Sequence, residues 1–245
     1  MDTLVSIIIP HWNGIDILSE CIDSLNNTEY SNFEIIVVDN YSSDESVKWL
    51  KANHPKIKII ENDKNYGYAG GCNRGINNSK GDYIVFLNND TIHKKDWLSN
   101  LVTFMNKHPD CAAVQPKILN YYERDKFDYA GGAGGHMDIL CYPFARGRLF
   151  LEQEIDNNQY DDDAPCFWAS GTAIMVRKEF FLEVEKFDEN FFAHMEEIDL
   201  CWRLQLKGHN IYVNPKSVIY HKNAVSLPMT SIKKFMLNHR NSLMM

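Results

Sequence analysis

The chain has 245 residues, 44% of them hydrophobic and 24% charged, which suffices for one large α/β domain with a sizeable core. A net charge of −8 argues against nucleic acid as a partner, because a nucleic-acid-binding face is normally basic. The six cysteines form no C-x-x-C pair, which fits reduced thiols better than disulfides or a zinc site.

The N-terminal residues resemble neither a signal peptide nor a membrane span. A strand-like run begins within a few residues of Met1, and no stretch of the chain approaches the roughly 18 apolar residues of a spanning helix. We therefore expect a cytoplasmic protein.

Four short β-branched runs in the first half of the chain predict strands that are covered on both faces. They are residues 4–10, 33–39, 57–61 and 82–87. Helical patterns fill the intervals, at residues 15–26, 44–53, 69–78 and 95–107. This alternation predicts a doubly wound, mostly parallel sheet.

The second half of the chain is less regular. A glycine-rich, aromatic stretch at 128–151 and an acidic run at 161–163 predict small antiparallel additions and flexible loops. Order returns with a predicted strand at 167–176, helices at 178–185 and 196–207, and short strands at 211–213 and 218–220.

The last residues, 231–245, have helical spacing and end without a helix-ending signal, so we expect a C-terminal helix that the chain end cuts short. Its apolar positions are Ile232, Phe235, Met236 and Leu243, and its cations are Lys233, Lys234, His239 and Arg240. Such a helix either contacts a membrane surface or a larger partner, or packs on the domain as an ordinary amphipathic helix.

Polar residues gather where the four predicted strands end. Ligands of an open parallel sheet bind beyond the carboxyl ends of its strands, so these residues should form one polar rim. In chain order they are Pro10, His11, Trp12 and Asn13, then Asp39, Asn40, Ser42, Ser43 and Asp44, then Asn65, Gly67, Gly70, Gly71 and Asn73, and finally Asn88, Asn89 and Asp90.

Two features of this rim suit a nucleotide. Asp39 can accept a hydrogen bond from an N–H of uracil or thymine, although the same residue also suits a turn. The segment 65–75 is glycine-rich and opens a helix, so its backbone can approach a ribose or pyrophosphate, with Arg74 available for charge.

Asp90 and His221 are candidate ligands of a divalent cation. Asp90 ends an Asn-Asn-Asp run after a buried strand, where its carboxylate either holds Mg²⁺ or Mn²⁺ or caps a helix. His221 closes the run VIYH and is either a second ligand or an ordinary structural histidine.

The predicted helix at 196–207 carries a candidate general base. Glu197 shares a helix face with Leu200, Cys201 and Leu204, which directs its carboxylate inward. Burial would raise its pKa and the helix N-terminus would lower it, which leaves the balance open. Glu196 is either a charge near the helix start or an acceptor contact.

Asp199 and Arg203 lie four residues apart on the same predicted helix. This spacing favours an ion pair on the helix face over a catalytic role.

Seven motifs in order carry a resemblance to a known family: IIIPHWNG, IIVVDNYSSD, NYGYAGGCNRG, YIVFLNND, WASGTAIMVRKEFF, FDENFFAHMEEIDLCWRL and YHKNAVS. From about residue 5 to about residue 241 the chain resembles the family 2 inverting glycosyltransferases, most closely a rhamnosyltransferase-like branch. The resemblance implies the GT-A fold, a Rossmann-like, mostly parallel central sheet flanked by helices with a smaller antiparallel acceptor-side region. Residues 1–115 would bind the nucleotide sugar, 116–230 would bind the acceptor and catalyse, and 231–245 would begin a C-terminal helix.

The resemblance also implies residue roles. Asp39 would contact the nucleobase, the 67–73 loop would lie near the ribose and diphosphate, and Asp90 with His221 would hold Mg²⁺ or Mn²⁺. Glu197 would deprotonate the acceptor hydroxyl, with Glu196 beside it. The other implied donor-binding residues are Pro10, Asn13, Asn40, Gly67, Gly70, Asn73, Arg74, Asn88 and Asn89, and the implied acceptor-binding residues are Trp168, Gly171 and Thr172.

Two departures from the family pattern concern the metal and the base. The metal motif has one carboxylate, because it reads Asn-Asn-Asp, and the usual Glu-Asp pair is Glu-Glu. We expect an inverting transfer from dTDP-rhamnose or a UDP-sugar to a hydroxyl of a glycan or lipid-linked acceptor in polysaccharide biosynthesis, at the inner face of the plasma membrane. The alternatives are a catalytically weak sugar-nucleotide-binding or regulatory domain and a nucleotidyltransferase, although the chain lacks the early G-x-G-T motif of the latter.

Overall fold

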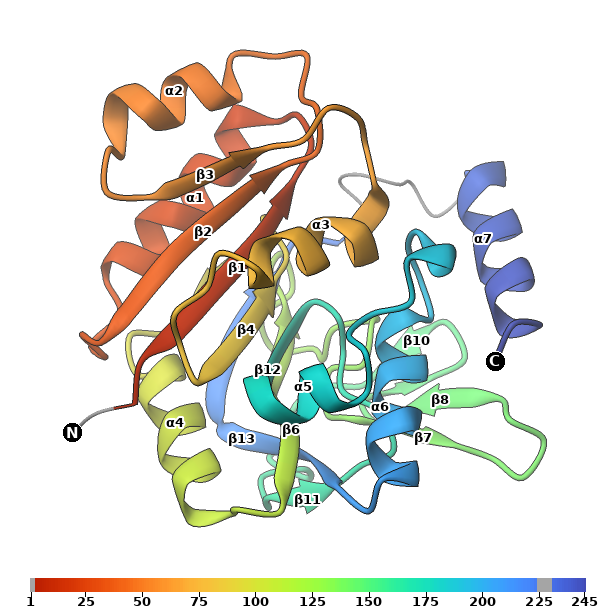
Figure 1. Cartoon of the computed structure of the whole chain (residues 1–245). Helices are drawn as coiled ribbons and strands as arrows, with labels where there is room; N and C mark the ends of the chain where they lie inside the picture. The colour runs from red at the N-terminus through yellow and green to blue at the C-terminus, as the bar shows by residue number, and fades with distance from the viewer. Residues whose placement is uncertain (1–2, 224–230) are drawn as a thin grey trace.

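The computed structural model describes residues 3–223 and 231–245 (Figure 1). Residues 224–226 of the YHKNAVS motif and the side chain of Lys233 lie outside this description. Within it, a central mixed sheet is flanked by helices on both faces, with two small sheets beside it.

The central sheet has the strand order β11-β13-β6-β12-β4-β1-β2-β3, and β5 pairs with β13. Its N-terminal part is parallel, as predicted: β1 (Val5–His11) pairs with β2 (Phe33–Asp39) and β4 (Tyr83–Leu87), and β2 pairs with β3 (Lys58–Glu61). The register aligns the carboxyl ends of β1 and β2, so the residues that follow them meet at one edge of the sheet.

The rest of the sheet is mixed. β12 (Ala173–Arg177) is antiparallel to β4 and to β6 (Cys111–Asn120), and β6 is parallel to β13 (Asn210–His221). The short strands β5 (Thr91–His93) and β11 (Ala164–Pro165) pair antiparallel with β13. The single path from β3 to β11 therefore joins both halves of the chain into one sheet.

Two small antiparallel sheets occupy the glycine-rich stretch, as predicted. One pairs β7 (Gly135–Met137) with β8 (Pro143–Ala145), and the other pairs β9 (Arg148–Leu149) with β10 (Glu152–Gln153). Figure 1 shows β7, β8 and β10 to the right of the central sheet, next to α6.

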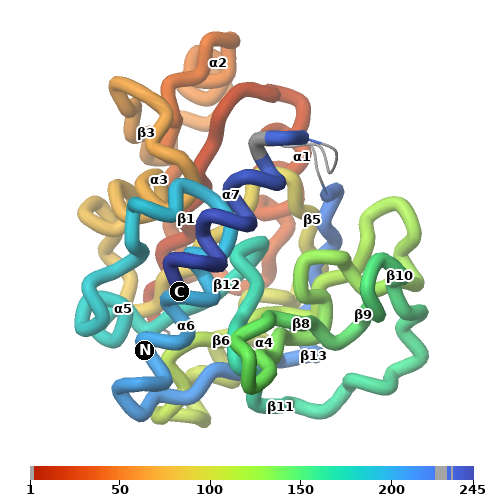
Figure 2. Tube along the Cα trace, turned by 90° about the vertical axis from the view of Figure 1, so that its right-hand side faces the viewer, coloured from red at the N-terminus to blue at the C-terminus, as the bar shows by residue number. Residues whose placement is uncertain are grey.

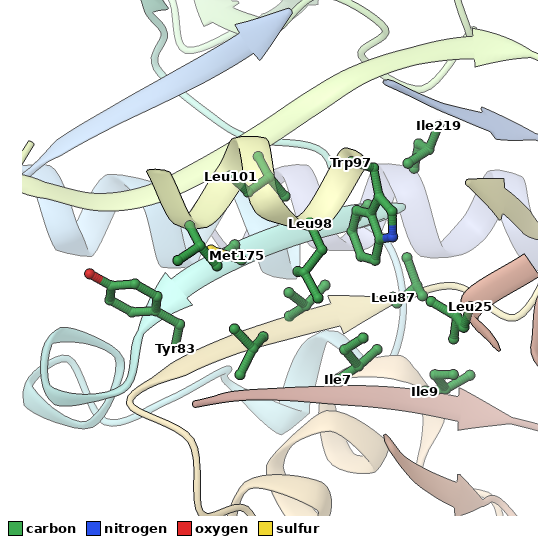
Figure 3. Close-up of a cluster of buried hydrophobic side chains, with 14 of the residues drawn as sticks. Ile7, Ile9, Leu25, Tyr83, Leu87, Trp97, Leu98, Leu101, Met175 and Ile219 are labelled. Atoms are coloured by element: carbon green, nitrogen blue, oxygen red, sulfur yellow. The ribbon is translucent and has the colours of Figure 1, made fainter. Parts of the chain in front are cut away.

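Helices cover both faces of the sheet, because successive residues of each strand direct apolar side chains to opposite faces. Ile7 and Ile9 of β1 belong to one buried cluster together with Trp97 and Leu101 of α4 (Figure 3). Ile8 belongs to the opposite cluster, which includes residues of α3, α5 and α6. The helices are α1 (Ile15–Asn26), α2 (Ser46–Asn53), α3 (Gly67–Ile76), α4 (Trp97–Lys107), α5 (Lys178–Glu183), the 3₁₀ turn η1 (Glu189–Phe191), α6 (Glu196–Leu206) and α7 (Ile232–Ser242).

The strands that follow α4 differ from the prediction in three respects. The strand expected at 167–176 begins only at Ala173, because the preceding segment leaves the sheet and packs against the glycine-rich stretch. The strands expected at 211–213 and 218–220 are one strand, β13, whose register shifts between Asn214 and Val218. The sequence analysis also missed β6, a central strand.

Candidate active site

One cavity of about 1000 Å³ lies at the carboxyl edge of the N-terminal strands. It brings together twelve of the residues to which the resemblance assigns a role: Pro10, Asn40, Gly67, Asn88, Asn89 and Asp90 from the first half of the chain, and Trp168, Gly171, Thr172, Glu196, Glu197 and His221 from the second half. It also contains His11, Trp12 and Asn65 of the predicted polar rim. The other residues with an assigned role, Asn13, Asp39, Gly70, Asn73 and Arg74, do not line it.

The loops that follow β1 and β2 are held together by hydrogen bonds. Asp39 is buried and its carboxylate accepts a hydrogen bond from the backbone N–H of Ser42 at 3.1 Å. The side-chain oxygen of Asn13 accepts hydrogen bonds from the N–H groups of Ser43 (2.8 Å) and Asp44 (3.3 Å). These contacts give Asp39 and Asn13 turn-forming roles in the described chain, and their contact with a nucleotide stays a prediction.

On α3, Asn73 and Arg74 face the segment before α6 rather than the cavity. Asn73 donates a hydrogen bond to the carbonyl of Phe187 at 2.8 Å and accepts one from its N–H at 3.2 Å. Arg74 forms an ion pair with Glu189 at 3.2 Å. Both residues therefore hold two parts of the site together, and their predicted donor contacts remain untested.

Asp90, His221 and Asp128 form a buried row. Nε2 of His221 lies 3.2 Å from Oδ1 of Asp90, and Nδ1 lies 3.1 Å from Oδ1 of Asp128. Burial alone would lower the pKa of His221, but Asp128 and Asp90 more than offset this and raise it to about 10. Burial would raise the pKa of Asp90, and the charge of His221 instead holds it below its usual value.

Asp90 and His221 of this row could supply two ligands to a divalent cation. Oδ1 of Asp90 is buried and faces Nε2 of His221 at 3.2 Å without a well-directed hydrogen bond, so a cation would take both atoms as ligands only after Nε2 loses its proton. Asp128 also accepts a hydrogen bond from the N–H of Ala130 at 2.7 Å, which fixes the carboxylate that orients His221. Within residues 3–223 and 231–245, no group of three or more His, Cys, Asp or Glu side chains could hold a metal ion.

Glu196 and Glu197 begin α6 on the other side of the cavity. Oε2 of each is buried without a hydrogen-bond partner in the described chain. Burial raises the pKa of Glu197 to about 7, against the opposing effect of backbone N–H groups, which resolves the balance that the sequence left open. Burial, and then the neighbouring Glu197, raise the pKa of Glu196 well above its usual value. A pKa near neutrality suits Glu197 for taking a proton.

The residues predicted to contact the acceptor are fixed by close packing. Trp168 is buried, and its indole N–H donates to the carbonyl of His136 at 2.9 Å. A Cβ on Gly135 would lie 1.9 Å from the Trp168 ring, which explains the need for glycine in this stretch. A Cβ on Gly171 would lie 3.7 Å from Glu197, so the chain passes close beside that carboxylate.

Asp199 and Arg203 form the predicted ion pair, with Nη2 2.6 Å from Oδ2. This pair lies on α6 outside the cavity lining, and the predicted ion pair is confirmed.

The chain matches the family described as glycosyl transferase family 2 over residues 6–181. The chain belongs to glycosyl transferase family 2. The family predicted from the motifs, and the glycosyltransferase class with it, is thereby confirmed.

Family 2 relatives are similar along most of the chain. Glycosyltransferase GlyG of Streptococcus pneumoniae is 26% identical over 238 residues, covering 94% of this chain and 74% of GlyG. The amylovoran biosynthesis glycosyltransferase AmsB of Erwinia amylovora is 32% identical over 219 residues, covering 84% of this chain and 65% of AmsB. The chain spans only 25% and 17% of two longer relatives, from Sinorhizobium fredii and Myxococcus xanthus.

Solved structures confirm the GT-A fold. The mannosyltransferase PcManGT of Pyrobaculum calidifontis, solved with GDP-Man and Mn²⁺, superposes with a TM-score of 0.65 at 16% identity, covering 91% of this chain and 57% of that one. GalNAc-T7, solved with UDP, GalNAc and Mn²⁺, gives a TM-score of 0.71 at 16% identity, covering 89% of this chain and 44% of that one.

The sequence analysis missed two contributions to the cavity region. Asp128 contacts His221 from 93 residues away, which no local pattern could show. Four residues of α7 line the cavity: Lys234, Phe235, Asn238 and His239. No described helix is long and apolar enough to cross a membrane.

Proposed function

We propose that this family 2 chain transfers a sugar from a nucleoside diphosphate to a hydroxyl of a glycan or lipid-linked acceptor, with inversion of the anomeric carbon. The observation that carries the proposal is the single cavity that contains both the Asp90–His221 pair and the Glu196–Glu197 pair. A role in polysaccharide biosynthesis is supported by the name of the relative AmsB. Residues 1–115 would supply the donor side and 116–230 the acceptor side.

The donor side of the cavity offers amide and backbone groups to a nucleotide. Asn88 and Asn89 present polar side chains, and Asn40 and Gly67 line the cavity beside them. Trp12 lines the cavity with 48% of its surface exposed, so its ring can stack on a base. We propose dTDP-rhamnose or a UDP-sugar as the donor, in line with the rhamnosyltransferase-like motifs.

Asp90 and His221 are the residues that would hold Mg²⁺ or Mn²⁺, with Asp128 orienting the imidazole. When bound, such an ion neutralises charge on the departing diphosphate. Two structural neighbours contain Mn²⁺ and a nucleotide or nucleotide sugar, which supports a divalent metal in the same kind of site.

Glu197 would act as the base. As the acceptor oxygen bonds to the anomeric carbon, its proton passes to the Glu197 carboxylate and the bond from that carbon to the diphosphate oxygen breaks. With a pKa of about 7, the carboxylate is present at neutral pH and still basic enough to take the proton. One displacement of this kind inverts the anomeric centre.

The C-terminal helix would contribute to binding an acceptor at a membrane. Ile232, Phe235 and Met236 of α7 are all exposed, which is consistent with the predicted contact at a membrane surface. Vesicle co-sedimentation of the chain and of a variant with these three residues replaced by serine would test this contact.

The first experiment measures sugar transfer with UDP-, dTDP- and GDP-sugars by the wild type, Glu197→Gln and the control Glu45→Gln. Glu197→Gln should reduce kcat by about 10²–10⁴-fold, the range for loss of a general base. The wild-type kcat should rise with pH through about 7, because only the deprotonated Glu197 accepts a proton. Glu45 is exposed on the surface and its variant should match the wild type.

Two results would contradict this assignment. Equal kcat values for Glu197→Gln and Glu45→Gln would remove Glu197 from the mechanism. Calorimetric binding of a nucleotide in the presence of Mn²⁺, without transfer to any acceptor, would favour the sugar-nucleotide-binding alternative.

A further inference from the structure

The loop of residues 191–195 leads directly into Glu196 and Glu197 and has an unusual backbone. Phe192, His194 and Met195 all have a positive φ, of 64°, 70° and 73°. Residues with a Cβ avoid this region unless surrounding contacts hold them there. The shape of the 191–195 loop therefore depends on the elements that grip it.

Helix α3, on the proposed donor side, holds one side of this loop by backbone hydrogen bonds. The N–H groups of Tyr68 and Ala69 donate to the carbonyl of Phe192, at 2.7 Å and 3.4 Å. A Cβ on Gly67 would lie 2.2 Å from the same oxygen, so the backbones of the two segments are in direct contact. The loop thus connects the start of α3 to the start of α6.

The C-terminal helix α7 grips the other side through Asn241, which has no exposed surface. Its Nδ2 lies 2.9 Å from the carbonyl oxygen of Phe191, 2.9 Å from that of Ala193 and 2.6 Å from that of His194. Three surrounding carbonyls fix the amide with its nitrogen toward the loop. Its Oδ1 accepts a hydrogen bond from Nε of Arg240 at 2.9 Å, so both ends of the amide are engaged.

Arg240 adds a second set of contacts from the same helix. Its Nη2 donates to the carbonyls of Asn190 at 2.8 Å and Phe191 at 2.9 Å. In Figure 2, α7 runs diagonally across the near face of the molecule and its C-terminal end lies beside α6. Residues from the end of the chain thus satisfy the backbone immediately before the catalytic pair.

We propose that Asn241, assisted by Arg240, is a positioning residue that sets the place of Glu197 by holding the 191–195 loop. This inference rests on the proposed function. Asn241 does not line the cavity, so it acts through the loop and not on the substrate. A displacement of a catalytic group by about 1 Å can cost roughly 10²-fold in rate, so a small relaxation of the loop suffices for a large effect.

The test replaces the amide by a carboxylate of the same shape, Asn241→Asp, in the full chain. Asn53→Asp is the matched control, because Asn53 makes one exposed hydrogen bond, to the carbonyl of Trp49 on α2. Asn241→Asp should lower kcat by roughly 10²-fold while the donor KM stays at the wild-type value. Arg240→Ala, which removes only the flanking contacts, should give a smaller loss and serves if Asn241→Asp does not fold.

A readout independent of catalysis is hydrogen exchange of the backbone amides at residues 190–197. Exchange there should be faster in Asn241→Asp than in Asn53→Asp, with the β1 and β4 amides unchanged. Unchanged exchange in this segment, or a loss confined to donor KM, would overturn the proposal, as would kcat equal to that of the control. If the wild type transfers no sugar, the proposed function fails, and exchange still decides whether Asn241 holds the loop.

Discussion

At the scale of single residues, Asp128 shows how a site depends on a side chain outside its motif. Its carboxylate has no exposed surface and lies 3.1 Å from Nδ1 of His221, so that Nε2 of the same ring faces Asp90. A carboxylate behind a ligating histidine fixes the ring and makes it a better ligand. The role that the motifs assign to His221 therefore depends on Asp128.

Asp128→Asn should lower the affinity for Mn²⁺ by about 10–100-fold, because the neutral amide keeps the shape of the side chain and loses its charge. Calorimetric titration of Mn²⁺ in the presence of UDP measures this. Asp125→Asn, an exposed change three residues earlier, is the control and should bind Mn²⁺ as the wild type does. Equal affinities in the two variants would show that Asp128 does not support the metal site.

At the scale of secondary-structure elements, β6 shows why a central strand escaped prediction. Gln115, Pro116 and Lys117 interrupt its apolar run, although all three are buried. The structure compensates with distant partners: Gln115 donates to the carbonyl of Gly131 at 2.8 Å, and Lys117 pairs with Asp156 at 2.8 Å. A buried polar group is acceptable once it is paired, and its partners are not visible in the local sequence.

The packing of α3 on β1 gives a prediction at the same scale. A Cβ on Gly75 would lie 2.4 Å from Cγ2 of Ile8, a fully buried, β-branched side chain that cannot easily move. Alanine gains about 1 kcal/mol in helix propensity over glycine, but overpacking a core costs about 1–3 kcal/mol. Gly75→Ala should therefore lower the free energy of unfolding by up to about 2 kcal/mol.

Thermal unfolding measures this change, which corresponds to a Tm lower by up to roughly 8 °C in a chain of this size. Asn77→Ala is the control, because Asn77 is exposed near the same helix end. A Gly75→Ala variant with the Tm of the control would mean that α3 shifts to make room.

At the scale of the whole molecule, the buried carboxylates of the cavity oppose folding. The pKa of Glu197 is about 7 in the folded chain against an ordinary value of 4.5, so the folded state binds more protons than the unfolded state between these values. Stability therefore falls as the pH rises from 4.5 through about 7, and the loss is complete above that range. The buried, charged carboxylate of Glu197 thus lowers the free energy of unfolding at neutral and higher pH.

Glu197→Gln removes that charge and should raise the Tm relative to the wild type by more at about pH 8 than at about pH 5. Differential scanning calorimetry at both pH values measures the two differences. Glu45→Gln should show no such pH dependence, since Glu45 is exposed. A Tm difference that is the same at both pH values would contradict the raised pKa of Glu197.

The sequence by itself determined the elements whose signal is local. The β-branched runs, the helical patterns between them and the polar residues at the strand ends were sufficient to predict the parallel half of the sheet and nine residues that line one cavity. The motifs determined the family, because their order and residue types can be read from the sequence without knowledge of any tertiary contact. The ion pair Asp199–Arg203 also followed from helix spacing alone.

Only the tertiary structure decided what depends on contacts between distant segments. The strand β6, the partner of His221 and the raised pKa of Glu197 all follow from burial and from neighbours far away in the chain. The hydrogen bonds from Asn241 to the loop before Glu197 also join distant segments, since 47 residues separate the nearest partners. Helix spacing alone does not reveal what the helix packs against. Local periodicity fixes which residues face inward, but only packing fixes what they meet there.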